Sequence, residues 1–150
     1  MLMLLSPRSS TSFHRGVRLL NARKQVLLQD EINASQAIQW RMHTNASVEI
    51  SGNSATLTIG DQTLVMTILN PPSGTVLNKT DAVRSPSDPA LPDGQVDQPN
   101  PGVTVVTIDI PAGSQTIQVL FNPQWSGMSS SDFVTPPSVA LADWTLTSHN

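Results

Sequence analysis

Residues 40–69 have the sequence WRMHTNASVEISGNSATLTIGDQTLVMTIL, and this stretch decides the fold class. Apolar and polar side chains alternate in three short runs, which the pairs Gly52-Asn53 and Gly60-Asp61 separate. Side chains on a β-strand point to opposite faces with a period of two, so each run gives one apolar face to a core. Glycine followed by Asn or Asp is typical of a tight hairpin turn. The stretch therefore predicts an antiparallel meander.

Apolar runs on both sides of the meander extend the β-pattern. The further strands that we expect are residues 17–20, 26–28, 37–42, 75–77, 103–110, 115–121 and 144–146. The first two pair as a hairpin that Asp30 and Glu31 close, and the runs before and after Pro111 pair as a second hairpin. The predicted fold class is all-β, an antiparallel β-sandwich of layered sheets with about seven or eight strands.

The length of 150 residues is that of one domain. Residues 1–14 are expected to be a disordered or truncated start, and residues 15–150 to form a single β-sandwich-like domain. Seven prolines fall within residues 71–101, and proline cannot donate to a β-ladder. We therefore expect a long solvent-facing loop over 71–101, with one short strand inside it.

The second face of the meander is only half polar. Opposite the apolar set that includes Leu57 and Met66, this face carries Thr56, Val65 and Leu69. A sheet with water on one side alternates cleanly, whereas a sheet covered on both sides does not. We expect a neighbouring layer or domain to cover part of the second face.

Composition excludes several classes of function. The chain has no cysteine, so it has no disulfide, zinc–thiolate site or thiol nucleophile. Its net charge is −3 and its largest basic cluster is the pair Arg23-Lys24, which argues against a nucleic-acid partner. The apolar residues 1–5 are too few for a membrane span or for the apolar core of a secretory signal. We expect no nucleic acid, membrane or cofactor as partner.

His43 is the one histidine inside a predicted structured element. As a general base it needs an acid partner such as Glu49, and as a metal ligand it needs companions that the histidines near the two ends are badly placed to supply. The aspartates of the long loop do not match a calcium-binding pattern. The chain also lacks Tyr and a Gly-x-Ser-x-Gly motif. The residues therefore predict no catalytic group and no metal site.

Trp125 is the best candidate for an exposed aromatic platform. It lies between Pro123 and the pair Ser126-Gly127, whereas Trp40 lies in a strand among apolar neighbours and is expected in the core. An exposed tryptophan face can stack on a sugar ring, and burial is the competing role. We take Trp125, together with His43, as the candidate glycan contacts. Acceptor motifs for N-glycosylation occur at Asn33, Asn45 and Asn78.

Four segments carry a resemblance to a known family. They are RGVRLLNARKQVLLQDEI (15–32), IQWRMHT (38–44), VEISGNSATLTIGDQTLVMTILNP (48–71) and GVTVVTIDIPAGSQTIQVLFNP (102–123). Their order resembles the C-terminal β-domain of heparinase II/III-like polysaccharide lyases, especially the fungal branch. In that family a hairpin ending in an Asp-Glu pair precedes a Trp-x-x-His strand, a meander ends at Leu-x-Pro, and a last hairpin ends near proline.

The resemblance implies a fold and a setting. Such lyases cleave acidic polysaccharides by β-elimination, and they join an α-helical toroid to a layered antiparallel β-sandwich. Their catalytic Tyr and Asn come from the toroid, and a catalytic His comes from a His-x-His-x-Asp segment. This chain has neither tyrosine nor that segment, and His43 matches the later Trp-x-x-His position, which is not the base.

The resemblance therefore favours a truncated C-terminal β-sandwich region of a heparinase II/III-like lyase, non-catalytic on its own. Its partners would be an acidic polysaccharide and a missing catalytic toroid, in a family that is typically secreted or on the cell surface. One alternative is an independent secreted glycan-binding module, with Trp125 and the loop over 71–101 as its contact surface. Another is a small hydrolase or lyase that pairs His43 with Glu49.

Overall fold

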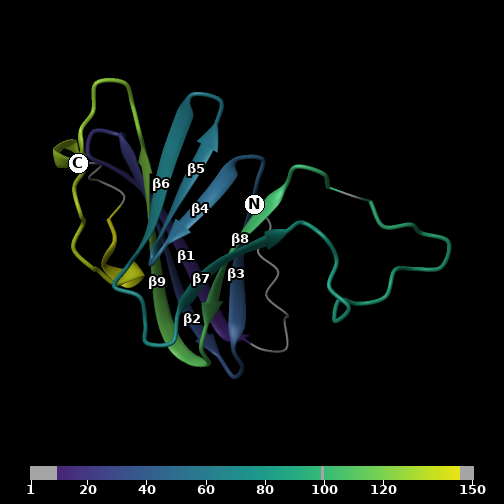
Figure 1. The fold of residues 1–150 in the computed structure, drawn as a ribbon. Helices are drawn as coiled ribbons and strands as arrows, with labels where there is room; N and C mark the ends of the chain where they lie inside the picture. Colours follow the sequence, from purple (N-terminus) through teal and green to yellow (C-terminus); the bar gives the residue numbers. More distant parts are fainter. Residues whose placement is uncertain (1–9, 99, 146–150) are drawn as a thin grey trace.

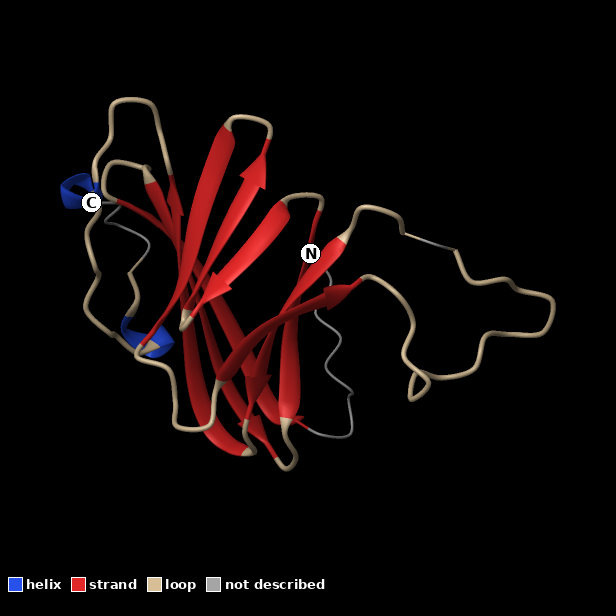
Figure 2. Ribbon diagram, viewed as in Figure 1, coloured by secondary structure: helices blue, strands red, loops and turns tan. Residues whose placement is uncertain are grey.

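The computed structural model of the protein describes residues 10–98 and 100–145. In this part of the chain, nine antiparallel strands form two sheets (Figure 1, Figure 2). The predicted all-β, sandwich-like fold is confirmed, with nine strands where about seven or eight were expected. The strands are β1 (Ser10–Leu20), β2 (Gln25–Ala34), β3 (Ile38–Thr44), β4 (Ser47–Ser51), β5 (Ser54–Ile59), β6 (Gln62–Leu69), β7 (Val76–Asp81), β8 (Thr104–Ile110) and β9 (Gly113–Pro123).

The larger sheet has six strands in the order β1-β2-β9-β6-β5-β4. The predicted meander forms its β4–β5–β6 edge, where Leu57 lies opposite Val48 on one side and opposite Leu64 on the other. Gly52 and Gly60 open the two turns with φ of 58° and 59°, which glycine adopts without steric cost. The meander prediction is confirmed, including both turns.

The smaller sheet has the order β3-β8-β7 and corrects one prediction. Strands β8 and β9 do not form a hairpin, because β8 pairs with β3 and β7 whereas β9 pairs with β2 and β6. Pro111 has no N–H to donate, and Gly113 takes φ 107°, so the chain passes from one sheet to the other at this corner. Ile108 and Ile117 still pack in one core, but across the sandwich instead of within a sheet.

Two strand boundaries near the start also differ from expectation. Strand β1 begins at Ser10, so residues 10–14, expected in a disordered start, are strand, and residues 1–9 lie outside the described residues. Strand β2 does not end at Asp30 and Glu31 but continues to Ala34. A charged residue can continue a buried strand here because Arg15, on β1, lies opposite Asp30 and pairs with it.

An edge strand was expected at residues 144–146. Trp144 and Thr145 are not part of a strand, and Leu146 lies outside the described residues. The expected short strand near residues 75–77 is present as β7, and it extends to Asp81. After β7 the chain leaves the sandwich as a long loop, residues 82–103, which projects to one side (Figure 1). No helix among the described residues is long and apolar enough to cross a membrane.

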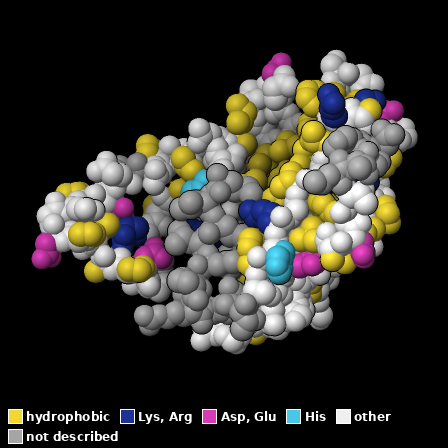
Figure 3. All heavy atoms as spheres, turned by 180° about the vertical axis from the view of Figure 1, so that it is seen from behind, with side chains coloured by type: hydrophobic (Ala, Val, Ile, Leu, Met, Phe, Trp, Pro, Cys, Tyr) yellow, Lys and Arg dark blue, Asp and Glu magenta, His cyan; other side chains and the backbone are white. Residues whose placement is uncertain are grey.

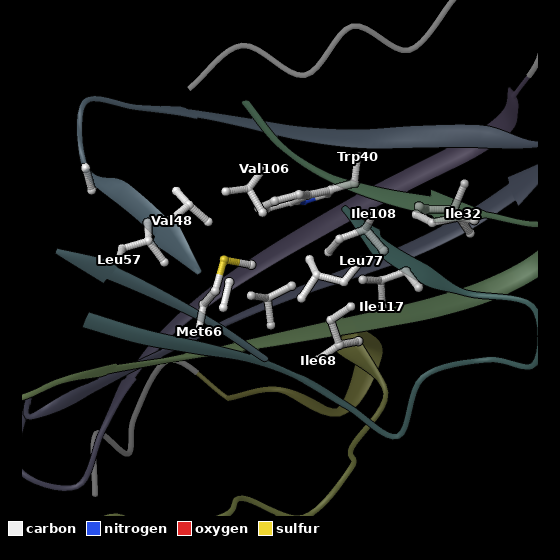
Figure 4. Close-up of a cluster of buried hydrophobic side chains, with 14 of the residues drawn as sticks. Ile32, Trp40, Val48, Leu57, Met66, Ile68, Leu77, Val106, Ile108 and Ile117 are labelled. Carbon is white, nitrogen blue, oxygen red and sulfur yellow. The ribbon is translucent and has the colours of Figure 1, made fainter. Parts of the chain in front are cut away.

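The main hydrophobic core lies between the two sheets (Figure 4). Trp40, on β3, is fully buried in it, as expected, and faces Met66 on β6 across the sandwich. The other large buried members come from both sheets and include Ile32, Val48, Leu57, Ile68, Leu77, Val106, Ile108, Ile110, Ile117 and Val119. Burial of this apolar surface from both sheets is the main force that holds the layers together.

The C-terminal part of the chain covers the outer face of the larger sheet over β1, β2 and β9. After β9 this part runs along β2 and β9 and contains two short 3-10 helices, η1 (Ser130–Asp132) and η2 (Leu141–Asp143). A second cluster, formed by Leu20, Leu27 and Leu120, lies under it, with Leu69 and Trp144 packed against it. Of the residues named on the second face of the meander, Leu69 packs against this cluster, and a further covering layer or domain stays a prediction.

Candidate functional site

Three hollows lie next to one another at the open end of the sandwich. The first, the apolar hollow, has a volume of about 330 Å³ and a floor that includes Leu57, Leu64 and Pro123. Its polar rim includes the side chains of Gln62 and Gln124. Figure 3 shows apolar side chains on the floor of a valley on this face of the molecule, with basic side chains at one side. The small sheet leaves this end of the larger sheet uncovered.

Trp125 stands between the apolar hollow and a second one. Its side chain is 53% exposed, and its indole Nε1 donates to the backbone oxygen of Lys24 at 3.3 Å. The backbone fixes it as well, because Gln124 N donates to Thr63 O at 2.9 Å and Met128 N donates to Trp125 O at 3.1 Å. One edge of the ring is therefore held while much of the side chain faces solvent.

The second hollow, the basic hollow, measures about 450 Å³ and contains Arg23, Lys24 and Asp132 as its charged residues. Asp132 is engaged locally: its Oδ2 accepts from Ser129 N at 2.7 Å and Ser129 Oγ at 3.0 Å. These hydrogen bonds, with a smaller contribution from the charge of Lys24, lower the pKa of Asp132. The two basic side chains thus give the hollow a net positive charge.

The β1–β2 turn that carries Arg23 is strained. Asn21, Ala22 and Arg23 have φ of 53°, 53° and 67°, in the left-handed region that residues with a Cβ rarely adopt. Such strain persists only where the surrounding structure enforces it, and it is common at ligand sites. Here the turn brings the basic pair Arg23-Lys24 to the edge of Trp125.

The third hollow, the His43 hollow, has a volume of about 690 Å³ and lies on the other side of the apolar hollow. Thr44 and Ile59 line both of these hollows, so the two are continuous. His43 is exposed, and Asn45 and Asn100 supply amides beside it. The structure thus brings His43 and Trp125, which are far apart in sequence, to neighbouring parts of one surface.

The proposed acid partner of His43 is not in place. Glu49 is exposed on β4, and the ion pair found within the described residues, Arg15–Asp30, involves neither of them. Nor do three His, Asp or Glu side chains gather anywhere in the described ranges as a metal ion would require. The hollows formed by the described residues therefore do not bring His43 and Glu49 together as an acid–base pair.

The remaining predicted positions are distributed over the surface. Asn33, Asn45 and Asn78 are all exposed, and Asn45 also lines the His43 hollow. The loop that was expected as a contact surface contributes Asn100 to the same hollow, while its tip projects away from it. Glycan contact at Trp125 and His43, and glycosylation of the three asparagines, stay predictions.

Sequence reasoning missed the polar rim of the surface. Thr44, Gln62, Thr63 and Gln124 come from strand ends and turns that lie together only after folding. The pair Arg23-Lys24 did stand out as the largest basic cluster, and its place in a hairpin turn was a usable signal for a local anion site.

Comparison of the chain with known protein families, curated proteins and solved structures finds no match.

Proposed function

We propose that this protein is a non-catalytic glycan-binding β-sandwich, of the kind that forms the C-terminal β-region of heparinase II/III-like polysaccharide lyases. The observation that carries the proposal is the position of Trp125, exposed and held at one edge, between an apolar and a basic hollow. Amide and hydroxyl side chains surround this platform on the side of the apolar hollow. The contact surface extends from the basic hollow to the His43 hollow.

The chemistry of a sugar ring fits this surface. A pyranose presents C–H groups on its faces and hydroxyls around its edge, so it needs an aromatic or apolar face bordered by donors and acceptors. Trp125 offers such a face, and Gln62 and Gln124 each offer both a donor and an acceptor. Several sugar units can be accommodated because the three hollows adjoin one another.

An acidic polysaccharide is the favoured ligand class. The chain as a whole carries a net charge of −3, which opposes nonspecific binding of polyanions. The basic hollow offers a local exception, with Arg23 and Lys24 next to the tryptophan. A guanidinium can form paired hydrogen bonds with a carboxylate or sulfate group.

The apolar valley, which contains the apolar hollow, supports a position of this β-sandwich beside a catalytic domain. Ile59, which lines both the apolar hollow and the His43 hollow, is 58% exposed, and apolar side chains gathered in a valley often mark a surface that another body covers. In a lyase, the helical toroid would be that body. Coding sequence for a toroid and a His-x-His-x-Asp segment upstream of this chain would establish this setting, and its absence would leave the independent glycan-binding module.

Binding to a glycan panel tests the function itself. Immobilised acidic polysaccharides (heparan sulfate, hyaluronan, alginate) and neutral ones (cellulose, chitin) are probed with the wild-type chain and with Trp125→Ala. We expect binding to at least one acidic polysaccharide, weakened about fivefold or more by Trp125→Ala, since loss of an aromatic contact costs about 1 kcal/mol. Val96→Ala, at a side chain that is 80% exposed in the long loop, is the matched control. The proposal is wrong if no glycan binds, or if both variants bind like wild type.

A further inference from the structure

The C-terminal segment 133–144, which we call the strap, is held on the outer sheet face by side chains that bind its backbone. Gln25, on β2, is fully buried. Its Oε1 accepts from Val134 N at 2.9 Å and from Asn21 Nδ2 at 2.8 Å. Its Nε2 donates to Val134 O at 3.0 Å and to Asn122 Oδ1 at 2.6 Å. This one amide uses its full hydrogen-bonding capacity, and half of it is directed at a single residue of the strap.

A second group of side chains holds the middle of the strap. Gln29 Nε2 donates to Val139 O at 2.8 Å, while Gln29 Oε1 accepts from Gln118 Nε2 at 2.8 Å. Glu31 Oε1 accepts from Leu141 N at 2.6 Å. Residues of β2 thus contact the strap every few residues, but the strap forms no β-ladder with the sheet.

The far end of the strap occupies a pit that a glycine leaves open. A Cβ on Gly16 would lie 2.5 Å from Leu141 Cδ2 and 2.7 Å from Trp144 Cζ3, which is closer than such contacts allow. The Trp144 indole Nε1 donates to Val139 O at 3.1 Å, and the ring packs on the Leu27 cluster. The absence of a side chain at Gly16 is therefore a condition for docking.

The covered face has the composition of a contact that can open. A permanently buried layer is mostly apolar, whereas interfaces that open and close are richer in polar groups. If the strap leaves, water can replace its hydrogen bonds to the polar side chains of this face, because amides and carboxylates are well solvated. These side chains are Gln25, Gln29 and Glu31. Release would leave a sheet face with exposed amides and a small leucine cluster.

The strap is also connected to the Trp125 platform. Residues 125–132 form the loop between them, and this loop is fixed at one end by the bond from Trp125 Nε1 to Lys24 O. At the other end, Asn21 Nδ2 donates to Asp132 O at 2.7 Å, and Gln25 binds Val134 two residues later. Asn21 and Gln25 therefore fix the end of the loop at Asp132, and residues of this loop line the basic hollow.

We propose that segment 133–144 is a reversible strap and that Gln25, assisted by Asn21, is the positioning residue through which its docking holds Trp125 in place for glycan. Only the ligand in this inference, a glycan, rests on the proposed function. Docking of the strap and ordering of the 125–132 loop can be measured without a ligand. Undocking frees the end of the loop at Asp132, so that the bond from Trp125 Nε1 to Lys24 O alone must orient the tryptophan side chain.

Hydrogen exchange of the full-length chain, followed by mass spectrometry, tests the strap directly. The variants are Gln25→Ala and Asn21→Gly. The second removes the amide but suits the φ of 53° at this position, so it serves if the first fails to fold. We expect the amides of Val134 and Met128 to exchange at least tenfold faster in both, with the β5–β6 amides unchanged. Gln115→Ala is the control, since this glutamine lies on β9 and its amide donates to Ala112 O instead of to the strap.

Gly16→Val separates the two ends of the strap. The added side chain displaces Leu141 and Trp144 while Gln25 remains intact, so we expect faster exchange at Leu141 with less change at Met128. Wild-type exchange rates at Val134 and Met128 in both Gln25→Ala and Asn21→Gly would overturn the proposal. So would equal acceleration in Gln115→Ala.

Glycan binding by the same variants distinguishes this inference from the proposed function. If the wild-type chain binds a polysaccharide, Asn21→Gly should weaken binding about as much as Trp125→Ala does, and unchanged binding would refute the positioning role. If the wild-type chain binds no polysaccharide, the proposed function fails, and accelerated exchange in the variants still supports the strap.

Discussion

Arg15 and Asp30 face each other across the β1–β2 pair and form an ion pair with two hydrogen bonds on the inner side of the sheet. Arg15 Nε donates to Oδ1 and Nη2 donates to Oδ2, both at 2.6 Å. The Asp30 side chain is fully buried, and the Arg15 side chain is 20% exposed. The guanidinium also lies 5.5 Å from the centre of the Phe13 ring. This pair adds a side-chain link to the backbone ladder that joins the edge strand β1 to β2.

Removal of the carboxylate should be strongly destabilising. Asp30→Ala leaves the Arg15 charge without this partner in a partly buried position, and loss of one member of a buried pair lowers the free energy of unfolding by about 3 kcal/mol. Urea unfolding measures the change. Asp61→Ala, in the exposed β5–β6 turn, is the control and should change stability by less than about 0.5 kcal/mol. A loss for Asp30→Ala no larger than that of the control would show that the pair contributes nothing.

The contribution of Asp30 to the free energy of unfolding should change with pH in the opposite direction to that of an ordinary paired carboxylate. Burial raises its pKa above the usual 3.8, and this effect outweighs the opposing effects of Arg15 and, more weakly, of Trp40. Between 3.8 and the raised pKa, the folded chain therefore binds more protons at this site than the unfolded chain. The contribution of Asp30 to stability is present below 3.8 and decreases as the pH rises through the raised pKa.

The difference in unfolding free energy between wild type and Asp30→Asn isolates this site, since other carboxylates contribute equally to both. Wild type should gain relative to the variant as the pH falls from 7 toward 4. NMR titration of the Asp30 carboxyl carbon gives the pKa itself, and a midpoint below 3.8 would contradict the expected direction.

Local pattern predicted the strands well but not their partners. The β4–β5–β6 meander follows from alternation and from Gly52 and Gly60, because short turns force neighbouring strands to pair. No such local constraint acts on β8, whose residues are buried on both faces. Its pairing with β3 and β7 depends on contacts across long sequence separations, and a β8–β9 hairpin was the simplest local solution.

The candidate site was predictable only in part for a related reason. Trp125 stood out because a tryptophan between turn-forming residues is hard to bury. The buried amides of Gln25 and Gln29 gave no such signal, since a glutamine in a strand normally indicates a solvent-facing position. Their burial follows from the strap, whose backbone supplies hydrogen-bond partners about 110 residues away in sequence.

Relief of the strained β1–β2 turn should stabilise the protein. Ala22 has φ 53°, which costs alanine about 1 kcal/mol and glycine almost nothing. Ala22→Gly should therefore raise the free energy of unfolding by about 0.5 kcal/mol, after allowance for the greater freedom of glycine in the unfolded chain. Equilibrium urea unfolding with an unchanged m-value is the measurement. Ala90→Gly, in the exposed long loop, should give no gain, and an equal gain there would show that turn strain is not the cause.

The open apolar valley should bind a hydrophobic dye in the native state. Ile59, which lines the apolar hollow, is 58% exposed, and exposed apolar surface of this kind binds ANS. We expect ANS fluorescence with a cooperative melting transition by circular dichroism, because the main core and the strap-covered face are complete without the valley. Ile59→Gln should reduce the fluorescence by about half or more and leave the midpoint within about 2 °C. Val83→Gln, at a side chain that is 68% exposed in the projecting loop, should change neither. Strong ANS binding with a broad transition in wild type would instead mean that the sheets do not pack stably without a covering partner.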